Sequence, residues 1–382
     1  MKKKTKAYKI ITVALFAAML VLLPVLTFVT MPSDPMPFSE NENRLLSAFP
    51  TVSFETFRNE KLMTGIEDWF SDRFFGREQW IKLRNASERL EGKTSINGVF
   101  TKNDRMIEIW GGFSEEFVGK NLKAMNNFAL KYPDISMYFL LAPTSQGVYS
   151  DMFPAGAPIG SQSAMLDFCR ENLPDIQTIN VIPTMKMHAD EYIYYRTDHH
   201  WASYGAYLAY YDAAKIMGFK PSELGEFDIE HASDSFRGTL YSKTLDDSVT
   251  PDIMDYYHRR GDKGIELTVN NGDKVTTSDS LYFREYLDVK DKYSSFLGPN
   301  APYIDINTGV DGPQLLIFKD SYAHALIPFL TSHFSRITVL DMRYINNGCS
   351  QYVNVKDYDS VLFVYNAITF SEDRNIRKLN QG

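Results

Sequence analysis

The stretch Gln314–Tyr322 reads QLLIFKDSY and decides the fold expected for this chain. Its apolar part, residues 314–318, has the length and composition of a buried strand, and a helical pattern follows over residues 322–334. Two more apolar runs come later, RITVL at 336–340 and SVLFVY at 360–365. Apolar strands that alternate with helices indicate a layered α/β fold with a mainly parallel sheet.

The same alternation extends toward the N-terminus. In chain order, the pattern predicts a helix at 121–131, a strand at 136–142, a helix at about 161–171, a strand at 176–182 and a helix at 203–217 with Gly218 as its C-terminal cap. From about residue 227 to 288 the runs become short and alternating, with turn residues between them. That change predicts antiparallel strands, which we interpret as a β-rich insertion.

The N-terminus predicts a membrane anchor. Residues 1–9 contain five lysines, and residues 10–31 contain no charge. About 22 apolar residues at roughly 1.5 Å each are enough to cross a hydrocarbon core of about 30 Å. By the positive-inside rule, residues 1–9 form a cytoplasmic tail, 10–31 a signal anchor, and the rest of the chain is extracellular. A cleaved signal peptide is the alternative, but FVTMPSDP offers no small-x-small cleavage site.

The rest of the chain has the composition of a globular protein. We expect a linker at 32–53, which contains four prolines, and one domain at 54–382, with helices as far as about residue 90. The 26 Phe and 23 Tyr residues are enough to build a large core. The net charge of −8, without a basic stripe, disfavours nucleic-acid binding. A single disulfide between Cys169 and Cys349 cannot be argued from sequence.

The string RTDHHW at 196–201 is the first candidate for chemistry. A carboxylate two residues before a histidine can accept a hydrogen bond from the ring Nδ1–H and leave Nε2 free to take a proton. In an extended segment, residues i and i+2 share a face. Asp198 and His200 should therefore act together, as orienting acid and general base, while His199 points away.

Ser321 is the second candidate. It follows the carboxyl end of a buried strand and precedes a helix, the place where α/β folds position their chemistry. Free backbone N–H groups at the start of that helix can stabilise an oxyanion. We therefore predict that Ser321 is a nucleophile. The alternative is that this serine only caps the helix.

Four other residues carry weaker expectations. Asn366 follows the strand at 360–365 and is a candidate second oxyanion donor, although it also suits a plain turn. Gly238, in the string FRGTL, would let the backbone approach a substrate closely, or would only make a turn. His324 and His333 fall on the helix after Ser321, where we expect them on its surface.

Asp198, His199 and His200 also suit a metal ion. Metal sites in proteins usually have three or four ligands with supporting groups around them. The sequence has no second cluster of His and Asp with comparable density. We therefore expect no metal and no other cofactor.

The string TDHHW, followed about 120 residues later by KDSY, resembles the bacterial DHHW protein family. That family is similar to the alginate O-acetylation proteins, a circularly permuted branch of the SGNH hydrolases. Supporting strings are ENENRLLSAFP at 40–50, DWFSDRFFGREQW at 68–80, LLAPTSQGVYSDMFPAG at 140–156, YYRTDHHWASYGAYLAYYDA at 194–213 and FRGTLYSK at 236–243.

The resemblance implies a circularly permuted, SGNH hydrolase-like (flavodoxin-like) three-layer sandwich. In that family the acid and the base precede the serine, which carries these roles to Asp198, His200 and Ser321. One position departs from the pattern: SGNH proteins place Gly two residues before the serine, and this chain has Lys319 there.

The function implied is that of an extracytoplasmic acyltransferase that O-acetylates a cell-surface polysaccharide or exopolysaccharide. The resemblance also implies a partner, a membrane-bound O-acyltransferase that supplies the acyl group. Tyr195, Arg196 and Trp201 are candidate substrate contacts, with rings that would stack on sugars; the alternative is that these rings belong to the core. Two other functions stay open: a carbohydrate acetyl esterase, and a non-catalytic polysaccharide-binding or assembly factor, which Lys319 favours.

Overall fold

The computed structural model describes residues 2–34, 36–42 and 44–381, and the chain forms two compact units. The first unit comprises the N-terminal part up to Ile96 together with residues 242–247. The second comprises Asn97–Tyr241 and the chain from Ser248 onward. The unit that contains the large sheet thus begins at Asn97, whereas the sequence led us to expect a domain from residue 54.

The first unit is mainly helical. Its elements are α1 (Lys2–Val29), β1 (Phe38–Ser39), β2 (Arg44–Leu45), α2 (Phe54–Arg58), α3 (Lys61–Arg73), α4 (Arg77–Leu90) and β3 (Ser95–Ile96). Within α1, the stretch Tyr8–Val29 has a mean hydropathy of 2.7 and is long and apolar enough to cross a membrane. This helix is the feature expected of a single-pass anchor.

The segment expected to be a linker is fixed to the first unit. Its strands β1 and β2 pair with each other, and Asp72 of α3 accepts hydrogen bonds from Arg44 Nη1 at 3.0 Å and from the Ser47 N–H at 2.8 Å. Burial acts to raise the pKa of Asp72, but these partners bring it below its usual value. Residues 44–47 are therefore held against α3 by a paired carboxylate.

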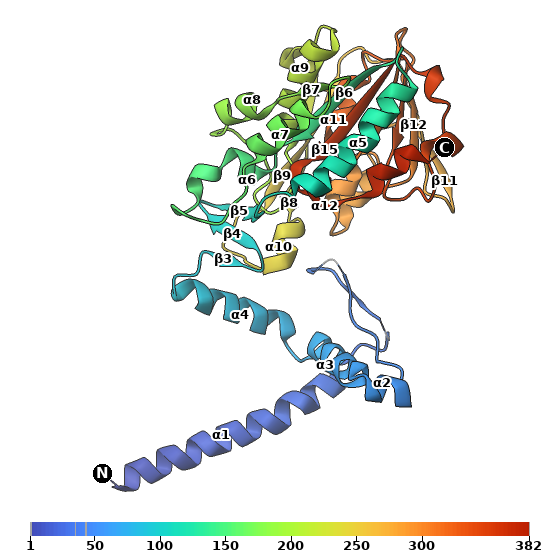
Figure 1. The fold of residues 1–382 in the computed structure, drawn as a ribbon. Helices are drawn as coiled ribbons and strands as arrows, with labels where there is room; N and C mark the ends of the chain where they lie inside the picture. Colours follow the sequence, from blue (N-terminus) through green and yellow to red (C-terminus); the bar gives the residue numbers. More distant parts are fainter. Residues whose placement is uncertain (1, 35, 43, 382) are drawn as a thin grey trace. The chain divides into compact units, whose positions relative to one another are not determined.

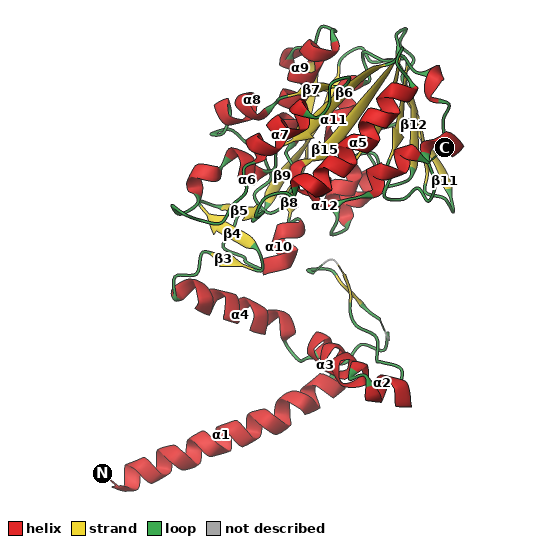
Figure 2. Ribbon diagram, in the orientation of Figure 1, coloured by secondary structure: helices red, strands yellow, loops and turns green. Residues whose placement is uncertain are grey.

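The second unit is built on an eight-stranded sheet with the order β11-β10-β12-β14-β13-β15-β6-β7. Figure 2 shows the strands of this sheet with helices packed beside them. The five strands from β14 to β7 are parallel, and β12, β10 and β11 extend the sheet in antiparallel fashion. Their bounds are β6 Ser136–Ala142, β7 Gln177–Ile179, β10 Glu266–Asn270, β11 Val275–Ser278, β12 Tyr303–Asn307, β13 Gln314–Lys319, β14 Arg336–Leu340 and β15 Ser360–Asn366.

The strand order confirms the circular permutation. If β13 is counted as the first strand, then β14, β15, β6 and β7 are the second to fifth, and the spatial order is 2-1-3-4-5. That is the order of flavodoxin-like sheets. The fourth and fifth strands are encoded before the first, so the chain forms this sheet from a permuted sequence.

Helices cover both faces of the sheet and complete a three-layer sandwich (Figure 1). Helices α9 (Ser203–Met217) and α11 (Ala323–Leu330) pack with the side chains of Leu315 and Ile317 on one face. Helices α5 (Glu115–Lys131), α7 (Gln162–Glu171) and α12 (Ala367–Glu372) pack with Leu316 and Phe318 on the other. A strand buried on both faces needs an apolar residue at every position, which explains the run LLIF.

Smaller elements complete the unit. They are β4 (Val99–Lys102), β5 (Arg105–Glu108), α6 (Ser145–Val148), α8 (Ile182–Met187), β8 (Phe227–Phe236), α10 (Thr239–Thr244, whose last residues belong to the first unit) and β9 (Asp252–Arg259). The antiparallel character expected for residues 227–288 is confirmed. Strands β8 and β9 form a separate two-stranded sheet, whereas β10 and β11 join the central sheet, because β10 pairs with β12.

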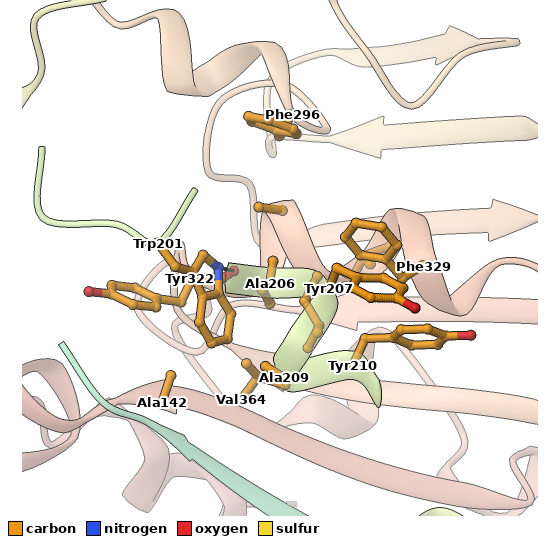
Figure 3. Close-up of a cluster of buried hydrophobic side chains, with 14 of the residues drawn as sticks. Ala142, Trp201, Ala206, Tyr207, Ala209, Tyr210, Phe296, Tyr322, Phe329 and Val364 are labelled. Atoms are coloured by element: carbon orange, nitrogen blue, oxygen red, sulfur yellow. Dashed lines mark hydrogen bonds between the residues drawn. The ribbon is translucent and has the colours of Figure 1, made fainter. Parts of the chain in front are cut away.

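Side chains of α9 pack against the residues that surround the histidine motif. Figure 3 shows Trp201 beside Tyr322, with Ala206 and Ala209 of α9 next to them. The two rings lie 5.1 Å apart between centroids, and both side chains are fully buried. Small residues on α9 allow this close approach, so the start of α9 and the segment after β13 form one packed core.

Gly205 supplies a stability test for this packing. A Cβ at Gly205 of α9 would overlap the carbonyl oxygen of Ile193, whereas a Cβ at Gly119 of α5 would meet nothing within 4 Å. We expect Gly205→Ala to lower the free energy of unfolding by about 1–3 kcal/mol, because backbone must move. Gly119→Ala should raise it by roughly 0.5–1 kcal/mol, the propensity gain of alanine in a helix. Urea unfolding followed by tryptophan fluorescence measures both, and equal effects of the two substitutions would contradict the packing described.

Candidate active site

Three side chains form a continuous hydrogen-bonded chain in the second unit. His200 Nδ1 lies 2.6 Å from Asp198 Oδ1, and His200 Nε2 lies 2.7 Å from Ser321 Oγ. Asp198 and His200 belong to the loop before α9, and Ser321 follows the carboxyl end of β13. The structure therefore brings together the three residues that the sequence proposed as acid, base and nucleophile.

The loop that holds Asp198 and His200 is a tight bend and not an extended strand. Its ends are joined by the bridge between Tyr194 and Trp201, and the His200 N–H donates to Asp198 Oδ1 at 3.0 Å. The argument from a shared strand face was therefore wrong, although the pair it selected does form. His199 does not point away: its ring centroid is 3.9 Å from that of His200.

The second oxygen of Asp198 is held by Thr239, the first residue of α10. Thr239 donates to Asp198 Oδ2 from its backbone N–H at 2.8 Å and from its hydroxyl at 3.0 Å. His199 Nδ1 lies 2.6 Å from the same hydroxyl. A Cβ at Gly238 would overlap the Asp198 side chain, so the close backbone approach expected at this glycine is toward the carboxylate and not toward a substrate.

Asp252 fixes the backbone before the motif, a role that the sequence gave no reason to expect. Its buried carboxylate accepts hydrogen bonds from the N–H groups of Arg196 at 2.5 Å and Thr197 at 2.8 Å, and from the Thr197 hydroxyl at 2.5 Å. The only signal was an aspartate at the start of a β-strand. Its partners become visible only when β9 is placed against the loop.

Tyr293 is a second residue that sequence reasoning missed. Its ring stacks on the His200 imidazole, with centroids 3.7 Å apart and planes inclined by 7°. Its hydroxyl donates to the Ser321 carbonyl oxygen at 3.1 Å. One buried tyrosine thus contacts both the base and the backbone of the serine, and it limits the rotation of the imidazole.

The segment around Ser321 is held by Asp320 and Asn366. Asp320 accepts the Tyr322 N–H at 2.9 Å and both the backbone and side-chain N–H of Asn366 at 2.7 Å. Asn366 Nδ2 also donates to Thr369 at 2.8 Å. Both amide hydrogens of Asn366 therefore have acceptors, and its role as an oxyanion donor stays a prediction.

Lys319 is fully buried and takes part in a polar cluster. Its ammonium lies 3.1 Å from Asp341 and 2.7 Å from both Asn300 Oδ1 and His324 Nε2. Burial lowers the pKa of Lys319, and Asp341 opposes that effect. The expectation that His324 lies on the helix surface was wrong, since the ring is buried.

The residues expected to contact a sugar occupy other positions. Tyr195 and Trp201 have no exposed surface, and the Trp201 indole N–H donates to the Tyr322 carbonyl at 3.0 Å, so neither ring is accessible for stacking. Both belong to the core, the alternative that the sequence left open. Arg196 is partly exposed; it lies 3.3 Å from Asp104 and its guanidinium is 4.8 Å from the Tyr192 ring centroid.

The charges of the site favour a neutral base beside an ionised acid. Burial lowers the pKa of the His200 imidazole to about 4, a shift that His199 strengthens and Asp198 opposes. Burial acts to raise the pKa of Asp198, but the two imidazoles and the hydrogen bonds it accepts bring that pKa below its usual value. Near neutral pH, Nε2 of His200 can therefore accept a proton.

The same residues form the group with metal-binding geometry. One ligand atom from each of Asp198, His199 and His200 lies within 4.8 Å of the others. Each carboxylate oxygen of Asp198, however, already accepts two hydrogen bonds, and both ring nitrogens of His200 have partners. A metal ion here would have to displace these bonds, so the arrangement fits acid–base chemistry better than ion binding.

The model of the DHHW protein family matches residues 111–340, which include the motif and the serine. The chain belongs to the DHHW protein family. A crystal structure of a DHHW family protein from Eubacterium siraeum is 23% identical and has a TM-score of 0.65, with 75% of this chain and 96% of that chain covered.

PatB1 of Bacillus cereus is also similar in structure. It is 21% identical with a TM-score of 0.63, and the match covers 74% of this chain and 99% of PatB1. PatB1 has also been solved with a sulfonyl adduct. At these identities the likeness establishes the fold alone. No curated protein matches the sequence.

The low pKa of His200 can be measured without any assay of activity. We expect its ring to titrate near pH 4 in histidine NMR spectra, with His200→Gln used to assign the signal. The unfolded chain, with a pKa near the ordinary 6.5, takes up this proton first as the pH falls. His200 should therefore reduce stability progressively between pH 6.5 and 4, and His200→Gln should flatten that part of the pH–stability curve. Titration of the ring near 6.5 would contradict the buried, neutral imidazole.

Proposed function

We propose that this DHHW protein is an extracytoplasmic O-acyltransferase that places acetyl groups on hydroxyls of a cell-surface polysaccharide or exopolysaccharide. The observation that supports it most is the unbroken chain Asp198–His200–Ser321, with heavy-atom distances of 2.6 and 2.7 Å. A hydroxyl within hydrogen-bond distance of a base that a carboxylate orients is the arrangement of an activated nucleophile.

The proposed reaction has two steps. In the first, Ser321 Oγ attacks the acyl carbonyl while His200 Nε2 takes the hydroxyl proton; the resulting oxyanion then expels the donor's leaving group, which receives that proton. In the second, His200 takes the proton of an acceptor hydroxyl, whose oxygen attacks the acyl-serine. The acceptor ester leaves, and Ser321 regains its proton. Asp198 holds the imidazole in the required tautomer throughout.

The backbone N–H of Ser321 is the oxyanion donor that we propose. It donates no hydrogen bond to any group within the described parts of the chain. The oxyanion forms on the carbon that becomes bonded to Ser321 Oγ, so the backbone N–H of the same residue lies close to it. A preorganised N–H in a buried site stabilises developing charge strongly. Asn366 would contribute as a second donor only if it released Asp320 or Thr369.

The N-terminal helix would determine where in the cell the acyl transfer takes place. We propose that α1 spans the membrane with residues 1–9 in the cytoplasm, because its apolar stretch Tyr8–Val29 is long enough to do so and lysines precede it. The acyl donor would then be supplied at the membrane by a membrane-bound O-acyltransferase. A tethered domain works at a raised local concentration of its donor and acceptor.

The decisive experiment assays the full chain in detergent with a chromogenic acetyl ester, with and without oligosaccharide acceptors. Transfer to the sugar supports the acyltransferase, and release into water alone supports an acetyl esterase, for which the partly exposed Ser321 leaves room. We expect Ser321→Ala, His200→Ala and Asp198→Ala each to reduce turnover roughly 10⁴-fold. His199→Ala should retain most of it.

A serine-directed reagent gives an independent readout. Sulfonyl fluorides react with activated serine hydroxyls, and the sulfonyl adduct of PatB1 makes the reagent class relevant here. The wild-type chain should gain one sulfonyl group at Ser321 in a mass spectrum, and His200→Ala should not. A folded protein with neither turnover nor labelling would favour the non-catalytic binding or assembly factor.

The contact between Gly238 and Asp198 provides a matched pair of variants. Gly238→Ala places a methyl group against the buried carboxylate, whereas a Cβ at Gly225 meets nothing within 4 Å. Because small displacements of a catalytic group cost up to about 10²-fold in rate, we expect Gly238→Ala to lower kcat/KM by about that factor. Gly225→Ala should behave as wild type. Comparable rates for the two variants would show that the position of Asp198 does not limit the reaction.

A further inference from the structure

The edge of the sheet that carries Ser321 extends well beyond β13. In the sheet, Phe318 of β13 lies beside Leu340 of β14, Leu340 lies opposite Tyr303 of β12, and Tyr303 lies opposite Asn270 of β10. The end of β10, the start of β11 and the residues before β12 therefore lie at the same edge as the residues that follow β13.

A cavity of about 270 Å³ opens at this edge. Its lining includes Asn271, Lys274, Phe283, Glu285, Tyr286 and Asn300. This lining combines two aromatic rings with two amides, an ammonium and a carboxylate. Such a combination suits a ligand that has both apolar C–H faces and many hydroxyls. Binding sites of this kind combine an apolar surface with a few polar groups that fix orientation.

We propose that this cavity is a second subsite for the acceptor polysaccharide. One polysaccharide molecule would place the hydroxyl that is acylated beside Ser321 and other sugar units of the same molecule in this cavity. The inference rests on the proposed function. Adjacent strands are about 4.8 Å apart, so β12 and β10 lie roughly 10 and 14 Å from β13 along the edge. A few linked sugar rings cover that distance.

Asn300 connects the cavity with the polar cluster before Ser321. Its Oδ1 accepts a hydrogen bond from Lys319 at 2.7 Å and faces Arg343 Nη2 at 3.4 Å. These cations fix the orientation of the amide. Within the described residues, Asn300 Nδ2 donates no hydrogen bond and Lys274 Nζ has no carboxylate partner within 4.0 Å, so both donors are available to a sugar.

A larger cavity lies at the opposite edge of the sheet and serves as the control site for the binding experiments. It measures about 430 Å³ and is lined by Lys131, Tyr132, Lys356 and their neighbours, which precede the amino ends of β6 and β15. The amino ends of parallel strands are at the edge opposite Ser321. This cavity also offers a tyrosine and lysines, so similar substitutions can be compared at the two sites.

The first test measures binding to the full chain in detergent, with Ser321→Ala present so that no turnover occurs. The probes are hexasaccharides with neutral, amino-sugar and uronic-acid backbones, each paired with its disaccharide. We expect at least one hexasaccharide to bind more tightly than its disaccharide. Tyr286→Ala or Lys274→Ala should weaken that binding about tenfold, which corresponds to about 1.4 kcal/mol. Tyr132→Ala and Lys356→Ala should not.

The second test measures acyl transfer with Ser321 restored. The ratio of the rates with hexasaccharide and disaccharide acceptors should fall in Tyr286→Ala and stay unchanged in Tyr132→Ala. No preference for the hexasaccharide with any backbone, or an equal loss in the Tyr132→Ala control, would overturn the subsite. If instead Ser321→Ala retained full turnover, the proposed function would fail, while the binding measurements would still decide whether the cavity holds sugar.

Discussion

The site depends on the carboxylate of Asp198, which is buried and ionised. A buried charge is costly unless it is fully hydrogen-bonded. Here one oxygen accepts the backbone N–H and the ring Nδ1 of His200, and the other accepts the backbone N–H and hydroxyl of Thr239. These four bonds join the histidine loop to the start of α10, and they leave Nε2 of the imidazole as the ring nitrogen that contacts Ser321.

The segment from β8 to β12 supports this carboxylate and its neighbours from several directions. Asp252 holds the backbone before the motif, and Tyr293 stacks on His200 while it contacts the Ser321 carbonyl. This segment therefore contributes to the site as well as to the antiparallel part of the fold. It extends the sheet through β10 and β11, and it supplies groups that fix the base and the nucleophile relative to each other.

Much of the fold could be predicted because local patterns and tertiary structure agree. The strand Ser136–Ala142 and the helix Ser203–Met217 have the predicted bounds, since prolines flank the one and Gly218, at φ 83°, ends the other. Helix α5 begins at Glu115, six residues before the predicted start, because Ser114 caps it.

The candidate site was less completely predicted. The spacing Asp-x-His and a serine after a buried strand were enough to select Asp198, His200 and Ser321, although the bend that brings the first two together could not be foreseen. Aromatic residues beside a motif do not reveal their own burial, which is why Tyr195 was expected to contact a sugar. Tyr293 carries no local signal at all, because its role arises only from packing against a distant loop.

The permuted strand order constrains how the protein folds. Strand β6 pairs with β15, so that Phe139 lies beside Phe363, and the centre of the sheet joins segments from opposite ends of the domain. Long-range pairing of this kind is slow and must wait for both partners. Until the last strand emerges, β6 presents an apolar, unpaired edge. The native sheet can therefore close only after β15 has been synthesised, because β13, which precedes the nucleophile, and β6 both pair with that strand.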